Sequence, residues 1–326
     1  AMGFGTRYPN APKPIATPRG AHAAIALAVE RLTPIGPNFF SKTKCISCHN
    51  QSLPAMAMRA AHLHGVALPA ETLAHGTSAT FEQWNPSWDT VLQGRRSIGG
   101  FVANISYGML QLRGEGQPST PITDAIAETL VRTQEPDGSW NIPDTRPPLG
   151  NGPIKWTALI MRGIDTYAAP ATRKRAGKAL ARGLAYLRTS KPADTQDAAF
   201  LMLGLHWNSA PNAEIAAAAH RLLALQRPDG GWGQTASMAP DAYATGQALW
   251  ALHEAGRLKP SDAAYQQGAQ FLLRNQQDDG SWFVRSRALA FQPYFDAGFP
   301  HGTDQFISAA ATSWAVLALS NTLPAR

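Results

Sequence analysis

Long apolar runs are absent from this sequence of 326 residues. The longest candidate, residues 309–319, is interrupted by Thr312 and Ser313. No run approaches the roughly 20 apolar residues that a membrane-spanning helix needs, so we expect no membrane span. The first residues, Ala1, Met2 and Gly3, resemble a remnant of cloning, and any native signal peptide is therefore expected to have been removed.

Charged residues are also scarce, at 16% of the chain. The net charge is +7, yet the basic residues at 42–44, 95–96 and 173–175 lie far apart in sequence, with few aromatic residues between them. A nucleic-acid-binding protein usually gathers such residues into one patch or stripe. We therefore expect a solvated basic surface and no nucleic-acid partner.

Apolar residues make up 44% of the sequence, which is ample for a sizeable core in a chain of this length. The 28 glycines and 25 prolines cluster between apolar stretches. This clustering indicates many short connections rather than disorder. We predict an extended N-terminal arm over residues 1–19, followed by a single domain over residues 20–326.

A seven-residue motif recurs three times in the second half of the chain. It reads Gln-x-x-Asp-Gly, then Ser or Gly, then Trp, at residues 134–140, 226–232 and 276–282. The first two copies lie about twice as far apart as the last two. A weakened copy at residues 183–190 fills the gap; it has kept the end of a helix but lost the Gln and the Trp.

Each copy follows an amphipathic helix and precedes a more apolar one, as at 263–275 and 307–320. Two earlier helix pairs, 21–32 with 45–63 and 69–81 with 99–112, have the same order without the motif. An open row of six pairs would need polar caps, and the last helix is strongly apolar. The fold class is therefore predicted as all-α, an (α/α)6 toroid of six helical hairpins with inner and outer rings of helices.

The motif resembles the QW repeat of squalene-hopene and oxidosqualene cyclases, whose toroid is shared with the prenyltransferases. The resemblance covers residues 119–319 well and the first hundred residues weakly. It implies the fold and not the activity, because in that family the Gln and Trp brace outer helices. We therefore interpret these residues as structural: Gln134, Trp140, Gln226, Trp232, Gln276 and Trp282.

The resemblance also implies where a cyclase would hold its acid, the middle carboxylate of an Asp-x-Asp-Asp motif that opens an inner helix. The matching segment here is 194–197, in which Gln196 stands at the place of the proton donor. An amide cannot protonate an alkene, so cyclase activity is not expected. We interpret Asp194, Asp241 and Asp304 as N-caps of inner helices.

The only two cysteines, Cys45 and Cys48, lie in the first helical pair. This argues against the zinc site of protein prenyltransferases, whose ligands come from other repeats. With His49 the two residues form Cys-x-x-Cys-His, the attachment pattern of c-type haem. On a helical turn the thiols would share one face and form thioethers to a porphyrin, with His49 as the proximal iron ligand. We therefore expect covalently bound haem c.

Three other interpretations of the motif remain open. Cys45 and Cys48 would form a disulfide in an oxidising compartment. A thioredoxin-like redox pair would be flanked by a βαβ pattern, which the sequence lacks. A zinc site would need at least one more ligand, to which His62 or His64 on the following turns could contribute.

The motif falls where the chain enters the first inner helix, which in a toroid is the mouth of the central cavity. Ring closure would bring the connection 283–303 of the sixth pair beside it, and connections of this length are more often functional. This one is rich in aromatic and basic residues: Phe283, Arg285, Arg287, Phe291, Tyr294, Phe295, Phe299 and His301. We predict that it folds over the mouth, with His301 as the distal catalytic group and Arg285 and Arg287 paired with the haem propionates. Exposed side chains are the alternative for all three.

We accordingly expect a periplasmic or secreted c-type haem protein with peroxidase-like or oxygenase-like redox chemistry on a largely apolar small molecule, and a redox partner protein as a further candidate partner. The alternatives are a non-catalytic haem module for electron transfer or sensing, and a haem-free binding protein or diverged terpene cyclase. Several aromatic residues of the inner helices would pack in the core or line the cavity: Tyr107, Trp156, Tyr243, Trp250 and Trp314.

Overall fold

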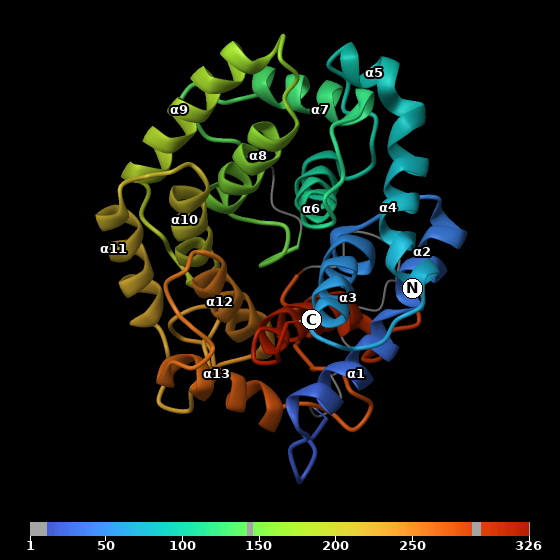
Figure 1. Cartoon of the computed structure of the whole chain (residues 1–326), viewed down its shortest axis with the longest axis vertical. Helices are drawn as coiled ribbons and strands as arrows, with labels where there is room; N and C mark the ends of the chain where they lie inside the picture. The colour runs from blue at the N-terminus through green and yellow to red at the C-terminus, as the bar shows by residue number, and fades with distance from the viewer. Residues whose placement is uncertain (1–11, 142–145, 289–294, 326) are drawn as a thin grey trace.

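The computed structural model describes residues 12–141, 146–288 and 295–325, and within these ranges all regular secondary structure is helical. The outer layer consists of α1 (Ala21–Leu32), α4 (Ala70–Trp84) with the short α5 (Trp88–Leu92), α7 (Pro121–Arg132), α9 (Arg173–Thr189), α11 (Asn212–Leu223) and α13 (Ala263–Arg274). The inner ring consists of α3 (Leu53–Leu63), α6 (Phe101–Gly114), α8 (Pro153–Tyr167), α10 (Thr195–Trp207), α12 (Ala242–Glu254) and α14 (Gln305–Ser320). The predicted (α/α)6 toroid is thus confirmed (Figure 1).

Burial separates the two layers as the sequence pattern predicts. Every residue of the inner helix α14 except Phe306 is buried. The outer helix α9 buries only one narrow stripe of small and apolar residues, Ala176, Ala179, Gly183 and Leu187. An inner helix has neighbours on all sides and therefore needs apolar residues all round, whereas an outer helix keeps a polar face toward water.

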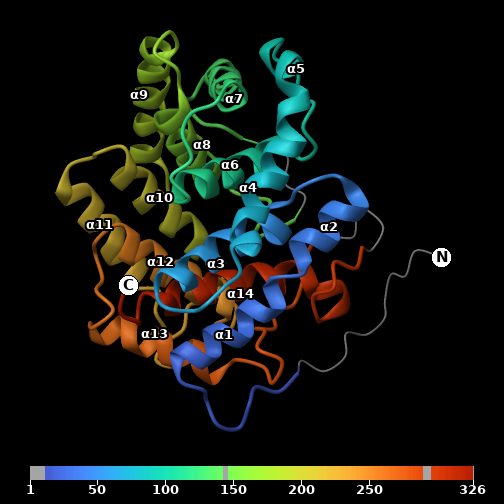
Figure 2. The same ribbon diagram turned by 45° about the vertical axis from the view of Figure 1, so that its right-hand side comes forward.

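The inner helices form a continuous ring. Each contacts its two sequence neighbours in the ring, and the last, α14, contacts both α3 and α1 of the first pair. Figure 2 shows α14 beside α3 and α1. No helix in the described part of the chain is long and apolar enough to cross a membrane.

The three motif copies make the same set of hydrogen bonds, which supports their structural interpretation. The indole Nε1 of each Trp donates to the outer helix that precedes it, as Trp232 does to the Leu222 carbonyl at 2.8 Å. The backbone N–H of each Trp is accepted by a threonine of the following inner helix, as by Thr245 Oγ1 at 2.9 Å. The Nε2 of each Gln donates two hydrogen bonds, one within its own turn and one to the next outer helix. Gln226, for example, donates to the carbonyls of Gly230 and Ala264.

Gln276 closes the ring by the same contact. Its Nε2 donates to the carbonyls of Gly280 and Ala24, both at 2.9 Å, and Ala24 belongs to α1. The described part of the N-terminal arm adds to this seam, because Ile15 N donates to the Gln276 carbonyl and the Arg19 guanidinium to the Asp278 carbonyl.

The glycine of each motif is required by the approach of the next outer helix. Gly280 has φ +89°, and a Cβ there would lie 2.6 Å from Leu27 Cγ of α1. Gly230 has φ +91°, and its Cβ would lie 2.4 Å from the Gln267 carbonyl oxygen of α13. A side chain at either position would combine a strained backbone with a steric clash.

We expect Gln276→Ala to destabilise the protein by about 1–3 kcal/mol, because two buried carbonyls at the ring seam would lose their donor. Gln226→Ala is the matched control: it makes equivalent bonds between adjacent repeats, but its side chain is half-exposed. The measurement is urea unfolding of both variants. A smaller decrease in the free energy of unfolding for Gln276→Ala than for Gln226→Ala would contradict a special role for the seam.

Candidate functional site

The Cys-x-x-Cys-His segment begins the first inner helix but is only partly helical. Ser47 is extended (φ −143°, ψ 151°), and its Oγ accepts the Asn50 N–H, so the helix starts at Cys48 with a π-helical turn, η1 (Cys48–Ser52). The expectation that Cys45 and Cys48 share a helical face is therefore wrong, because the Ser47 cap leaves Cys45 outside the helix. Both cysteines are free thiols.

Cys48 and His49 are buried at the end of the ring where the inner helices begin, called here the N-terminal mouth. Cys48 Sγ lies 3.7 Å from His49 Nδ1, and the His49 ring packs edge-on against Phe306 of α14, with 5.9 Å between centroids. The Arg146 guanidinium lies over the same Phe306 ring, 5.2 Å from its centroid. The predicted position of the motif at a mouth of the ring agrees with these contacts.

Burial controls the ionisation of both groups. It raises the pKa of the Cys48 thiol to about 11, although Lys155 and Arg146 act in the opposite direction. Burial, together with the Arg146 cation, lowers the pKa of His49 to about 3. At neutral pH the motif therefore presents a protonated thiol and a neutral imidazole.

Gln196, at the place of the cyclase acid, is buried and fully engaged. Its Nε2 donates to the Pro148 carbonyl at 2.8 Å, and its Oε1 accepts the Tyr243 hydroxyl at 2.8 Å. Lys155, also buried, donates from Nζ to the carbonyls of Pro148 and Leu149 at 3.1 and 2.7 Å. The two side chains hold segment 146–152 inside the ring of inner helices (Figure 1).

Sequence reasoning missed Lys155 and Arg146. A signal for Lys155 was present, since a lone lysine stands among apolar residues of an inner helix and is completely buried in the structure. Buried lysines almost always have specific partners. Arg146 carried no such signal, because it lies in a connection and reaches Phe306 only through the ring closure.

Two of the three proposed N-caps are confirmed. Asp194 accepts the Asp197 N–H at 2.8 Å, and Asp241 accepts the Ala244 N–H at 2.9 Å. Asp304 does not cap α14 with its side chain. Its Oδ1 instead accepts the Ser286 N–H at 2.7 Å, because the connection before α14 folds back onto it.

A cluster of buried polar atoms occupies the ring interior. Tyr107 Oη, Trp156 Nε1, Trp314 Nε1 and both polar atoms of the Gln247 side chain are buried and make no hydrogen bond of good geometry with the described residues. The rings of Tyr107 and Trp156 are 6.3 Å apart. The Tyr243 hydroxyl lies within hydrogen-bonding reach of Tyr107, Gln247 and Trp314. Four inner helices, α6, α8, α12 and α14, thus direct buried polar atoms into one region, and most of these atoms are donors.

The connection 283–303 is described except for residues 289–294, so the predicted contributions of Phe291 and Tyr294 lie outside the described residues. Phe295 packs edge-on against Phe39 at 5.1 Å, and Asn38 Nδ2 donates to the Ala297 carbonyl at 3.3 Å. Both partners belong to α2 (Ile35–Thr43), a helix that the sequence did not predict and that leads directly to Cys45. The connection therefore lies beside the segment that carries the motif.

His301 Nε2 lies 2.7 Å from Ser281 Oγ, and its ring packs against Phe283 and Phe299. None of these described contacts is with the Cys-x-x-Cys-His turn, and the distal role stays a prediction. Arg285 and Arg287 are exposed and lie near Asp304. Burial raises the pKa of that carboxyl, and the two cations partly offset the rise. Their pairing with propionates also stays a prediction.

The described residues contain no group of three or more His, Cys, Asp or Glu side chains that could hold a metal ion. The interpretation of the cysteines as part of a zinc site therefore gains no support from the geometry.

Three solved structures are similar to the chain over most of its length. A protein from Actinoplanes is 17% identical (TM-score 0.57; 93% of this chain and 99% of that chain covered). A type II terpene cyclase from Scytonema in complex with merosterolic acid A is 15% identical (TM-score 0.52; 93% and 98%). A glycosidase in complex with glucose is 12% identical (TM-score 0.59; 93% and 97%).

The chain has the toroid fold of terpene cyclases and glycosidases. Identities this low establish the fold alone. No family model matches the chain, and no curated protein matches it.

The Asp194 cap gives the mouth a measurable pH dependence. Burial raises the pKa of Asp194 to about 6 from an ordinary value of 3.8; the capping hydrogen bond from the Asp197 N–H opposes this rise, and the Asp197 carboxylate adds to it. Between these pH values the native protein binds more protons than the unfolded chain, so this residue makes the free energy of unfolding fall as the pH rises.

We expect Asp194→Asn, which keeps a capping oxygen, to have a free energy of unfolding in urea that changes less between pH 4 and 6 than that of the wild type and is higher at pH 7. The exposed Asp89→Asn is the control; an unchanged slope in Asp194→Asn would contradict the assignment.

Proposed function

We propose that the chain binds a largely apolar small molecule inside the ring and does not cyclise it by protonation. The observation that carries this proposal is the cluster of buried polar side chains at Tyr107, Trp156, Gln247 and Trp314, whose polar atoms lack hydrogen bonds of good geometry. Each buried polar group without a partner costs about 1–3 kcal/mol. A fold is not expected to keep several of them in one place unless something binds there.

The chemistry of the cluster defines the ligand. Its unpaired atoms include two indole N–H groups, an amide NH₂ and a phenol hydroxyl, so they offer mainly donors. Aromatic side chains surround them, including Trp250 and Trp314, whose ring centroids lie 5.1 Å apart with the planes tilted by 46°. An apolar molecule that carries an acceptor oxygen, such as a ketone or quinone, complements this interior.

The absence of acid-initiated cyclisation follows from Gln196. Protonation of an alkene needs a strong acid with a free proton, and this amide is held at one end by Tyr243 and at the other by Pro148. The carboxylate neighbours do not replace it, since Asp194 and Asp241 are occupied as caps. The chain is in this sense a diverged relative of the cyclase toroids that keeps the ring and lacks the acid.

We expect an isoprenoid ketone such as farnesylacetone to quench the tryptophan fluorescence of the protein and to bind more tightly than squalene, which has no acceptor oxygen. Gln247→Leu should weaken ketone binding by roughly tenfold, the equivalent of about one hydrogen bond. The exposed Gln93→Leu is the control. If Gln247→Leu bound the ketone as tightly as the wild type, binding inside the ring would lose its support. Formation of a cyclised product from squalene or a prenyl diphosphate would contradict the proposal that the protein does not cyclise its ligand.

Covalent haem is a second candidate function, favoured by the Cys-x-x-Cys-His motif at the N-terminal mouth. The donor set fits the group: Cys45 and Cys48 are free thiols, and His49 is a neutral imidazole. Arg146 and Lys155 lie near Cys48 and are cations suited to propionates. When bound, haem would supply redox chemistry at the entrance to the ring, and Phe306 would orient the His49 ring. Such a protein would be periplasmic or secreted and would exchange electrons with a partner protein.

Expression in the periplasm with cytochrome c maturation machinery tests this function. We expect a Soret band and an intact mass increased by one haem, both of which persist after denaturation because thioether bonds are covalent. Cys48→Ala should lose the covalent haem while its far-ultraviolet circular dichroism stays native.

Three outcomes separate the candidate functions. If the intact mass is unaltered, no haem is attached, and binding of an apolar molecule inside the ring remains as the proposed function. A low-spin, six-coordinate spectrum that peroxide and small ligands do not perturb would indicate electron transfer or sensing rather than turnover. A spectrum that changes in His301→Ala would support the distal role of that residue.

A further inference from the structure

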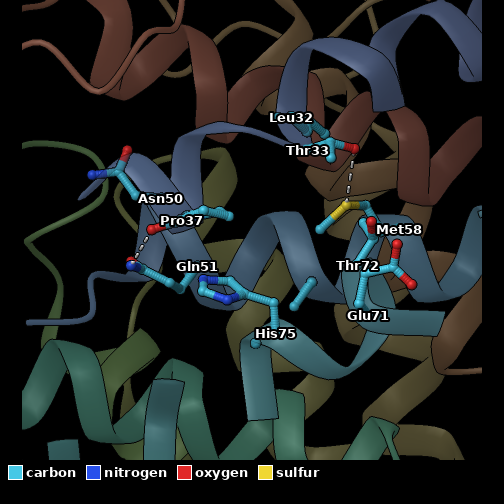
Figure 3. A pocket seen from close by; sticks show the side chains of 12 residues that line it. Leu32, Thr33, Pro37, Asn50, Gln51, Met58, Glu71, Thr72 and His75 are labelled. Atoms are coloured by element: carbon cyan, nitrogen blue, oxygen red, sulfur yellow. Dashed lines mark hydrogen bonds between the residues drawn. The ribbon is translucent and has the colours of Figure 1, made fainter. Parts of the chain in front are cut away.

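A pocket of about 230 Å³ lies on the side of the Cys-x-x-Cys-His turn that faces the outer layer, apart from the polar cluster in the ring interior. Its walls come from the end of α1, from α2, η1 and α3, and from one face of α4 (Figure 3). Asn50 and Gln51, which directly follow His49, form one of these walls. Neither the proposed ring ligand nor haem accounts for this pocket.

The wall next to the motif is held in place by Gln51. The Gln51 Oε1 accepts the Ser47 N–H at 2.7 Å, and its Nε2 donates to the Gly36 carbonyl at 3.2 Å. The side chain is buried and therefore bridges the motif turn and α2. Because both ends of the amide are bonded, the wall is rigid and the pocket is preformed.

The opposite wall carries the polar group that would select a ligand. His75 of α4 has a buried Nε2 beside the Gly36 backbone, and this atom makes no hydrogen bond of good geometry with the described residues. Burial lowers the pKa of His75, although a hydrogen bond to the Gly36 backbone and the charge of Glu82 act in the opposite direction, so the ring is neutral at pH 7. Phe40 packs edge-on against it at 6.4 Å and fixes its orientation. A neutral imidazole exchanges one hydrogen bond readily with a hydroxyl group.

The remaining walls suit an aromatic ring. Leu32, Pro37 and Met58 supply apolar surface, and the thioether of Met58 favours contact with aromatic carbon. Thr33 Oγ1 donates to the Val29 carbonyl at 2.9 Å, with Met58 Sδ 3.7 Å away, so its proton is already engaged. An apolar cavity of about 150 Å³ is large enough for benzene. The pocket, at about 230 Å³, therefore has room for one substituted ring.

We propose that this pocket binds a single-ring aromatic alcohol of the phenol class, with the ring against Leu32, Pro37 and Met58 and the hydroxyl on His75. This site is separate from the ring interior, and its occupancy does not require haem or the isoprenoid ligand. Through the rigid Gln51 bridge, a phenol bound here would rest against the turn that contains Cys48 and His49.

Titration calorimetry of the full chain with p-cresol and toluene tests the proposal. We expect p-cresol to bind roughly tenfold more tightly than toluene, the difference of about one hydrogen bond. His75→Phe should abolish this preference, and His75→Gln, which keeps a polar group, should restore part of it. Equal affinities for the two probes in the wild-type protein would overturn the role of His75.

Two further variants locate the bound phenol. Thr72→Trp places an indole at the half-exposed rim of the pocket and should lower p-cresol affinity at least tenfold, whereas Ala74→Trp, exposed on the same helix, should leave it unaltered. Gln247→Leu should also bind p-cresol like the wild type. Loss of p-cresol binding in Gln247→Leu, or full binding in Thr72→Trp, would place the phenol elsewhere and overturn the proposal.

Discussion

One glutamine side chain per motif fixes the geometry of the ring. Its amide completes its own Asp-Gly turn and donates to a carbonyl of the next outer helix, which joins successive hairpins through a directional contact that is buried at Gln276 and partly buried in the other two copies. Apolar packing between helices is strong but has little direction, whereas a hydrogen bond to a particular carbonyl sets both distance and register. Since Gln276 makes this bond to α1, the contact that builds the row of hairpins also closes it. The position of the N-terminal mouth follows from that closure.

The fold could be predicted from the sequence because it is built from a repeated local pattern. The motif spacing, the alternation of amphipathic and apolar helices and the apolar last helix all point to a closed ring, and each depends only on neighbouring residues. The two errors have different causes. The first inner helix begins at Cys48 because Ser47 caps it locally, and Ser47 was not predicted as a cap. Asp304 bonds to Ser286 rather than capping α14 because the connection between them folds back.

The candidate site could be predicted only in part. The Cys-x-x-Cys-His motif and the lost acid at Gln196 are local patterns and stand at the mouth of the ring. The side chains around them come from different hairpins: Arg146 from the third, Tyr243 and Gln247 from the fifth, and Phe306 from the sixth. A residue whose contacts come from other hairpins leaves little trace in its own sequence neighbourhood. A buried lysine in an apolar helix, such as Lys155, is the exception.

The seam between Gln276 and Ala24 has a consequence for how the molecule acquires its structure. In an open row of hairpins, each unit can fold on its predecessor as the chain emerges, and folding can stop at any length. Here α1 and the arm before it have their partners in the sixth hairpin, some 250 residues later. The first hairpin can complete its packing only after the last has formed. Folding therefore ends with one long-range step of high contact order, which is slow and cooperative. A polypeptide truncated before the sixth hairpin would expose two unpaired apolar flanks at once.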